Sequence, residues 1–243
     1  MNIPIYVESK IYVDHLINVL DVSESNIVYV YPEKSTFFKY KDSGLHFVIN
    51  SFQKKQIHID FLKGQMGWRL KRTDHETLLK NALGKKNDSL KILDGTAGYL
   101  SDSLIFLALG HKVIACEQSK ILFMLLNDAI DRAKNELIFL SNLKLIQGNA
   151  IDIYKTNKDI DLIYLDPMYP DNKKNALRSG NMNDIKNILD IEMIDNLEDQ
   201  IFFDFKKEQF NKIVLKRPIK SKIIDQNLNY QVKGKSTRFD VYI

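Results

Sequence analysis

From about residue 89 onward, short apolar runs alternate with segments whose apolar positions recur at helical spacing. The apolar runs predict strands at residues 91–93, 112–116, 143–147, 161–165 and 212–216. The helical spacing predicts helices at residues 101–109, 120–140 and 183–196, and residues 229–233 and 238–243 predict a terminal antiparallel hairpin. Strands that alternate with helices form a parallel sheet covered on both faces, so this part predicts an α/β fold.

The first 75 residues have a different pattern, with several strand-like runs and one short helix-like segment. Apolar runs predict strands at residues 3–7, 27–31 and 44–50, and strict alternation predicts a half-buried strand at residues 56–61. Residues 9–20 have the spacing of a short helix. We therefore predict a small α+β lobe at residues 1–75, followed by a larger α/β domain at residues 76–243.

The composition is that of an ordinary globular protein, with 243 residues, 44% of them hydrophobic and 27% charged. No apolar run approaches the roughly 18 residues that span a bilayer, and the first residues lack the pattern of a signal peptide. The single cysteine, Cys116, cannot form a disulfide within the chain, so we expect a cytoplasmic protein with no membrane partner. The histidines lack the spacing of metal ligands, and the net charge of +4 permits nucleic acid as a partner without requiring it.

Candidate chemistry follows the predicted strands, at the edge of the sheet where α/β proteins bind ligands. Residues 94–98 read DGTAG, in which Gly95 and Gly98 allow a sharp turn, but the G-x-G-x-x-G pattern of dinucleotide sites is absent. Glu117 ends the next strand, where a carboxylate can accept both hydroxyls of a ribose. Taken alone, residues 94–98 could be an ordinary turn between a strand and a helix, and Glu117 could be a solvated strand end. Together they favour an adenosyl ligand without phosphate, such as S-adenosylmethionine.

The residues after the predicted strand 161–165 read Asp-Pro-Met-Tyr-Pro. The carboxylate of Asp166 and the carbonyl of Pro167 offer acceptors for an amino group, and Tyr169 offers a ring that stacks on the base carrying it. The alternative is a proline-rich turn whose tyrosine packs on the core. The combination with residues 94–98 and Glu117 favours the first interpretation.

Three blocks of residues resemble the RsmJ family of bacterial methyltransferases, which modify a guanosine of 16S ribosomal RNA at N2. They are LDGTAGYLSDSLIFLALGHKVIACEQS, IYLDPMYP, and VLKRP with KGKSTRFDVY, and the resemblance covers residues 55–243. It implies a Rossmann-like class I fold with S-adenosylmethionine as the cofactor, and small-subunit ribosomal RNA as the partner. The alternatives are an amino-methyltransferase acting on DNA adenine or a protein amide, and a non-catalytic RNA-binding protein of the same fold.

The resemblance and the loop positions together assign roles to individual residues. The expected cofactor-binding residues are Asp94, Gly95, Gly98, Ser101, Asp102, Glu117, Gln118, Asn149, Ala150 and Asp166. The expected catalytic residues are Asp166, Pro167 and Tyr169. Ser101 and Gln118 stand where the family has arginines, and Asn149 and Ala150 stand where it has paired serines. Of the family's GGGRGE stretch, only Glu76 matches, within LKRTDHE at residues 70–76.

Basic residues near these loops are candidates for RNA contacts. Lys173, Lys174, Arg178, Lys216 and Arg217 are expected to lie on the rim of the base pocket and to bind RNA phosphates. Trp68 is flanked by Lys63, Arg69, Lys71 and Arg72, which form either a phosphate-contact patch with a stacking ring or a plain solvated face. We expect Arg238 and Asp240 to be a structural pair, and Cys116 to be a core residue.

Overall fold

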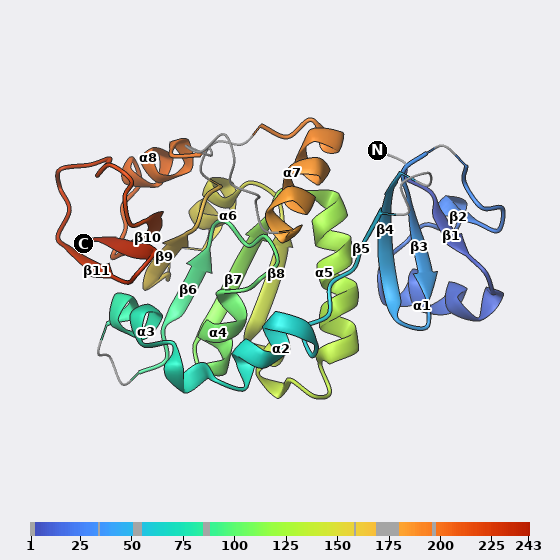
Figure 1. Ribbon diagram of the computed structural model, residues 1–243, viewed down its shortest axis with the longest axis horizontal. Coiled ribbons are helices and arrows are strands. Elements are labelled where there is room, and N and C mark those ends of the chain that lie inside the picture. Colours follow the sequence, from blue (N-terminus) through green and yellow to red (C-terminus); the bar gives the residue numbers. More distant parts are fainter. Residues whose placement is uncertain are drawn as a thin grey trace.

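A computed structural model describes residues 3–33, 35–50, 55–84, 88–157, 159–168, 180–195 and 198–243. Its larger sheet has seven strands in the order β11-β12-β10-β9-β6-β7-β8 (Figure 1). The strands are β6 (Lys91–Asp94), β7 (Lys112–Glu117), β8 (Leu143–Gln147), β9 (Leu162–Leu165), β10 (Ile213–Pro218), β11 (Tyr230–Lys233) and β12 (Thr237–Tyr242). Strands β6 to β10 are parallel, and β12 pairs antiparallel with β10 and β11. The predicted α/β fold and the terminal hairpin are confirmed.

Alternating residues of the central strands pack into two separate hydrophobic clusters, one on each face of the sheet. Ile92 and Tyr164 belong to the first cluster, while Leu93 and Leu165 belong to the second. The first face is covered by α3 (Thr77–Leu83), α4 (Ser103–Ala108) and α5 (Lys120–Ala133). The second is covered by α6 (Ala150–Thr156) and α8 (Gln200–Lys206). Burial on both faces explains why the central strands read as continuous apolar runs in the sequence.

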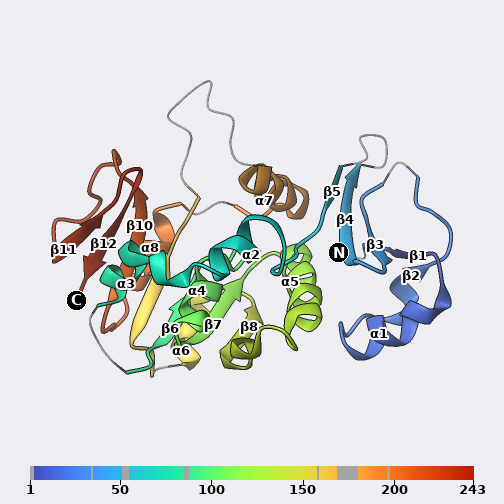
Figure 2. The same ribbon diagram turned by 60° about the horizontal axis from the view of Figure 1, so that its bottom comes forward.

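A second, five-stranded sheet comes from the first part of the chain and lies beside α5 (Figures 1 and 2). Its order is β2-β1-β3-β4-β5, with β1 (Ile5–Val7), β2 (Ile27–Val28), β3 (Phe37–Lys41), β4 (Gly44–Asn50) and β5 (Lys55–Ile57), and it carries the short helix α1 (Val13–Asn18). The backbone N–H of Leu45 donates to the buried carboxylate of Asp128 on α5 at 3.0 Å. Arg132 pairs with the same carboxylate at 2.8 Å and donates to the carbonyl of Ile59. Side chains of both sheets also belong to one hydrophobic cluster. The division of the chain into two domains after residue 75 stays a prediction.

Several predicted element bounds are wrong. The helix predicted at residues 120–140 ends at Ala133, because a turn at residues 134–137 leads into a 3₁₀ helix, Ile138–Asn142. The helix predicted at 183–196 is α7 (Gly180–Glu192), which ends where Met193 adopts a φ of 54°. The strand predicted at 27–31 is only two residues long. Within the described residues, no helix combines the length and apolarity needed to cross a membrane.

Candidate active site

The loop after β6 is shaped by the carboxylate of Asp94, which is 2% exposed. Asp94 accepts hydrogen bonds from the Thr96 backbone N–H at 3.0 Å and from the Ser103 hydroxyl at 2.6 Å. Burial raises the pKa of Asp94 to about 6. Gly98 has a φ of 50°, in the left-handed region that glycine adopts without strain. These contacts turn the chain sharply away from the sheet and leave the backbone open to a ligand.

Glu117 ends β7, the neighbouring strand, and holds the same loop from the other side. One carboxylate oxygen accepts from the N–H of Gly98 at 3.1 Å, and the other accepts from the N–H of Ser119 at 2.8 Å. Burial raises the pKa of Glu117 to about 7, although both hydrogen bonds oppose this shift. Each oxygen of a carboxylate has a second lone pair, so Glu117 retains acceptor capacity toward the cavity that it lines.

Two cavities meet above this edge of the sheet. The smaller one, of about 160 Å³, lies between the glycine loop, Glu117 and the apolar side chains of Leu122 and Leu189. The larger one, of about 520 Å³, reaches from Asp94 and Asp102 to β10 and the start of β12. Residues 96–98 and 166–168 line both cavities. The Asp166 backbone N–H donates to the Thr96 hydroxyl at 2.7 Å, which fastens the two loops together at this junction.

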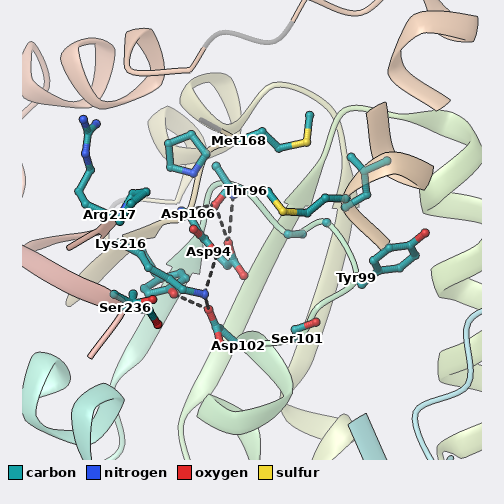
Figure 3. A pocket seen from close by; sticks show the side chains of 18 of the residues that line it. Asp94, Thr96, Tyr99, Ser101, Asp102, Asp166, Met168, Lys216, Arg217 and Ser236 are labelled. Atoms are coloured by element: carbon teal, nitrogen blue, oxygen red, sulfur yellow. Dashed lines mark hydrogen bonds and ion pairs between the residues drawn. The ribbon is translucent and has the colours of Figure 1, made fainter. Parts of the chain in front are cut away.

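A set of ion pairs around the buried Asp102 lies in the wall of the larger cavity (Figure 3). The ammonium of Lys216 lies 2.8 Å from a carboxylate oxygen of Asp102 and 2.8 Å from one of Asp166. The Tyr164 hydroxyl donates to Asp102 at 2.5 Å, and Arg69 pairs with the other Asp102 oxygen at 2.8 Å. These cations hold the pKa of Asp102 well below its usual range. Burial still raises the pKa of Asp166, because Lys216 must compensate two carboxylates.

Arg69 links this network to α2 (Gly64–Leu70), a helix that packs against α4. Its guanidinium forms a double hydrogen bond with Glu76, at 2.6 and 3.0 Å, and donates to the carbonyl of Ser101 at 2.8 Å. Arg69 therefore matches neither the phosphate contact nor the plain solvated face, because Glu76, Asp102 and the Ser101 carbonyl occupy its donors. Glu76, which matches the family pattern, acts here as the partner of Arg69.

Most of the expected cofactor and catalytic residues come together around the two cavities. Those that line at least one cavity are Asp94, Gly95, Gly98, Ser101, Asp102, Glu117, Gln118, Asp166 and Pro167. Asn149 and Ala150 line neither of them. The Asn149 side chain instead caps α6 by accepting from the Ile151 N–H at 2.8 Å, and Ala150 is buried.

Lys216 and Arg217 of β10, which we expected on a basic rim, both form ion pairs within the protein. Lys216 is held between Asp102 and Asp166, and Arg217 is only 6% exposed and pairs with Asp199. Carboxylates within the protein thus hold both side chains, and a contact of Lys216 and Arg217 with RNA phosphates stays a prediction. Tyr169, Lys173, Lys174 and Arg178 lie outside the described residues.

Arg238 and Asp240 form the structural pair that the sequence predicts. Their side chains are joined by hydrogen bonds of 2.8 and 3.1 Å, and both are buried. The Arg238 guanidinium also donates to backbone carbonyls of Pro218, Ile219, Ser221 and Lys222. The pair therefore holds the end of β10, where Pro218 lines the larger cavity, and the loop that follows it.

Helix α7 covers the junction between the cavities from above, with Ile185 in the wall of both. Glu192, at the end of α7, accepts from the backbone N–H groups of Lys120 and Ile121 at 3.0 and 3.3 Å, and from the Ser119 hydroxyl. These contacts cap the first turn of α5, close to Glu117. Cys116 is buried, which raises the pKa of its thiol, and the described residues contain no group of side chains that could hold a metal ion.

The chain resembles known proteins along most of its length. Residues 22–243 match a family described as "Putative SAM-dependent methyltransferase". A protein of Desulfotalea psychrophila named ribosomal RNA small subunit methyltransferase J is 32% identical over 196 residues, covering 78% of this chain and 74% of the relative. A protein of the same name from Francisella philomiragia is 29% identical over 95% of this chain and 96% of its own. The crystal structure of a SAM-dependent methyltransferase from Neisseria gonorrhoeae matches with a TM-score of 0.65 at 23% identity, covering 99% and 96% of the two chains.

The sheet and the matches define the class of the protein as the class I methyltransferases that depend on S-adenosylmethionine. The chain belongs to the family of the ribosomal RNA small subunit methyltransferases J. This confirms the resemblance seen in the sequence motifs. The donor set fits the cofactor, because the smaller cavity combines the Glu117 carboxylate with apolar walls that suit an adenine ring.

Proposed function

We propose that this enzyme methylates the exocyclic N2 amine of a guanosine in 16S ribosomal RNA of the small subunit. The observation that carries the proposal is the place of Asp166 and Pro167, which line both cavities at their junction. An amine held there lies between the proposed cofactor site and the open side of the larger cavity. The names of the relatives, which refer to small-subunit ribosomal RNA, support RNA as the substrate.

In this proposal the smaller cavity binds the adenosyl group. Glu117 accepts hydrogen bonds from the ribose hydroxyls, and Leu122 and Leu189 pack on the adenine. The glycine loop approaches the cofactor closely through its backbone. S-adenosylmethionine, when bound, supplies a methyl group that its sulfonium makes electrophilic. The protein therefore mainly has to position the acceptor amine in line with it.

The acceptor side depends on the loop that follows β9. The guanine amine is a weak nucleophile because its lone pair is delocalised into the ring. The Asp166 carboxylate and the Pro167 carbonyl accept its two hydrogens, which orients the nitrogen and favours the attacking geometry. As the new N–C bond forms, the bond from the methyl group to the sulfonium sulfur would break and leave S-adenosylhomocysteine, and Asp166 would receive the proton that the amine loses. Tyr169 stacks on the base.

A guanine in a folded RNA reaches such a cavity only after it leaves its base stack. Removing a base from its stack costs a few kcal/mol, which stacking on Tyr169 partly offsets. Ribosomal RNA is made and assembled in the cytoplasm, so we propose that the enzyme acts there.

The proposal is tested in cells with and without the gene for this protein. Small-subunit RNA is isolated from both, digested, and analysed for methylated guanosines by mass spectrometry. We expect one N2-methylguanosine to disappear with the gene and to return when the gene is restored. An unchanged set of methylated guanosines would contradict the proposal.

A further inference from the structure

Helix α2 and the residue pair after it present an exposed aromatic and basic face beside the larger cavity. We propose that Trp68, Lys71 and Arg72 form a docking surface for an RNA segment next to the target base. The inference rests on the proposed function, because it assumes that RNA brings its base to the larger cavity. Two of these residues, Lys71 and Arg72, lie in the 70–76 stretch, where the chain departs from the family's GGGRGE pattern.

Trp68 is unusual among the aromatic residues because its indole is 59% exposed. The guanidinium of Arg72 lies over its ring at 4.6 Å from the centroid, within the range of a cation–π contact. A ring paired with a guanidinium in this way offers both a stacking face and a positive charge, as single-stranded nucleic acids require.

The charge of this face is not neutralised by the protein. Lys71 and Arg72 are exposed, and neither forms an ion pair in the part of the chain that the structure describes. Of the neighbouring carboxylates, Glu76 pairs with Arg69, and the fully exposed Asp74 lies 3.8 Å from Lys80. A polyanion therefore finds two cations and a ring on one short surface.

The surface is held at a fixed position relative to the cavity. Arg69 of the same helix binds Asp102 and Ser101, and Gln65 and Arg69 themselves line the larger cavity. Gly67 packs so closely that an added Cβ would overlap the carbonyl of Leu62. Figure 2 shows that α2 lies across α4, between α4 and α7 in this view. An RNA segment on this face thus continues directly into the cavity.

The charge and the ring favour RNA over a protein partner. Phosphate contacts supply most of the affinity in nucleic-acid complexes, and an aromatic ring accepts any base. A protein partner would need acidic side chains opposite Lys71 and Arg72, together with an apolar pocket for Trp68.

The test uses Trp68→Ala and the double variant Lys71→Gln/Arg72→Gln of the full chain. Tyr29→Ala is the matched aromatic control, because Tyr29 is 52% exposed and has Lys10 over its ring at 5.9 Å, but lies on the small sheet's side of the molecule. Lys112→Gln/Lys144→Gln is the basic control, because both lysines are exposed near the opposite, amino ends of β7 and β8. Binding of cofactor, of naked small-subunit RNA and of assembled subunits is measured for each, with methylation kinetics.

We expect Trp68→Ala to weaken RNA binding by about 5- to 150-fold, the loss of one stacked base. The KM for RNA should rise, while kcat at saturating RNA and cofactor binding should stay at the wild-type values. The double variant should lower the salt slope of RNA binding by about 0.7–0.9 for each lost contact. Neither control should change these quantities.

Wild-type kinetics and RNA binding in both Trp68→Ala and the double variant would overturn the inference. Weaker binding to assembled subunits alone, with naked RNA bound normally, would assign the surface to a ribosomal protein and would also overturn it. If the wild-type enzyme methylates no RNA, the proposed function itself fails. The wild-type reaction therefore separates the two failures.

Discussion

The ammonium of Lys216 lies 2.8 Å from the carboxylate of Asp166, at the junction of the two cavities, and Asp102 holds the same ammonium from the other side at an equal distance. Lys216 therefore compensates the charge of two neighbouring carboxylates, of which Asp102 is buried and Asp166 is partly exposed. A buried carboxylate such as Asp102 is tolerated only because it is paired and hydrogen-bonded. The arrangement orients one Asp166 oxygen and leaves the other for a ligand.

Lys216→Met should leave Asp102 and Asp166 without their shared cation, so the pKa of Asp166 should rise further. We expect the pH profile of single-turnover methylation to move to higher pH. Stability should fall by at most about 3 kcal/mol, below the loss typical of fully buried pairs, because the Asp166 side chain is 37% exposed. Chemical denaturation measures this loss in the free energy of unfolding. Lys216→Arg keeps the charge and serves as the control, and an unshifted pH profile in Lys216→Met would refute the role of Lys216.

Cofactor affinity should depend on pH through Glu117, whose pKa is raised to about 7. The ionised carboxylate accepts hydroxyl hydrogen bonds, so binding should strengthen as the pH rises through about 7. The stability of the free protein should change in the opposite sense. Its contribution from Glu117 is present below the pKa of an unfolded Glu, 4.5, and is lost as the pH rises through 7.

Glu117→Gln separates this dependence from that of Asp94, whose pKa is raised to about 6. The variant should bind cofactor about 1.5–3 kcal/mol more weakly than the wild type at pH 8, the range for a hydrogen bond to a charged group. Its affinity should also vary less between pH 6 and 8. Calorimetric titration across this range checks both statements, and equal affinities would remove Glu117 from the cofactor site.

Arg238→Ala should be strongly destabilising although Arg238 lies at the end of the chain. It leaves the Asp240 carboxylate, which is fully buried, without its cation and removes the donors to the loop after β10. The expected loss is about 3–5 kcal/mol in the free energy of unfolding. Urea denaturation measures it, with Lys235→Ala, an exposed position in the same hairpin, as the control. A loss similar to that of the control would contradict the structural role.

Tyr169 should contribute to binding of the target base and not to binding of the cofactor. Tyr169→Ala removes a stacking face worth about 1–3 kcal/mol, whereas Tyr169→Phe keeps the ring and should remain largely active. Single-turnover methylation and cofactor titration of both variants provide the measurement. Loss of cofactor binding in Tyr169→Ala, or full activity without the ring, would end this assignment.

The fold could be predicted where burial imposes a pattern on the sequence. The central strands are buried on both faces, so each appears as an apolar run, and the residues that follow them meet at one edge by topology alone. Helices α2, α3, α6 and α8 were not predicted, because each has only seven residues, fewer than two turns, and lacks the nearly continuous apolar run that marks α4. The strand β3 was missed because Lys39 and Lys41 interrupt its apolar run.

The ion pairs of the site could not be predicted from the sequence. Arg69 and Lys216 lie far along the chain from Asp102, so their contacts depend on how the sheet and α2 come together. Asp102 occupies the N-cap position of α4, yet its side chain makes no capping bond and pairs with the cations instead. Lys216 and Arg217 are neighbours in the sequence, but alternate along β10 and bind different carboxylates.

The central claim is methyl transfer from S-adenosylmethionine to a guanine N2 amine in small-subunit RNA. Its most direct test is a reconstituted reaction of the purified full chain with methyl-labelled cofactor and small-subunit RNA from cells that lack the gene. We expect label in N2-methylguanosine at one site, and its loss in Asp166→Asn under conditions where that variant still binds cofactor. Label in a methylated adenine or in protein, or bound cofactor with no transfer to RNA or assembled subunits, would contradict the account.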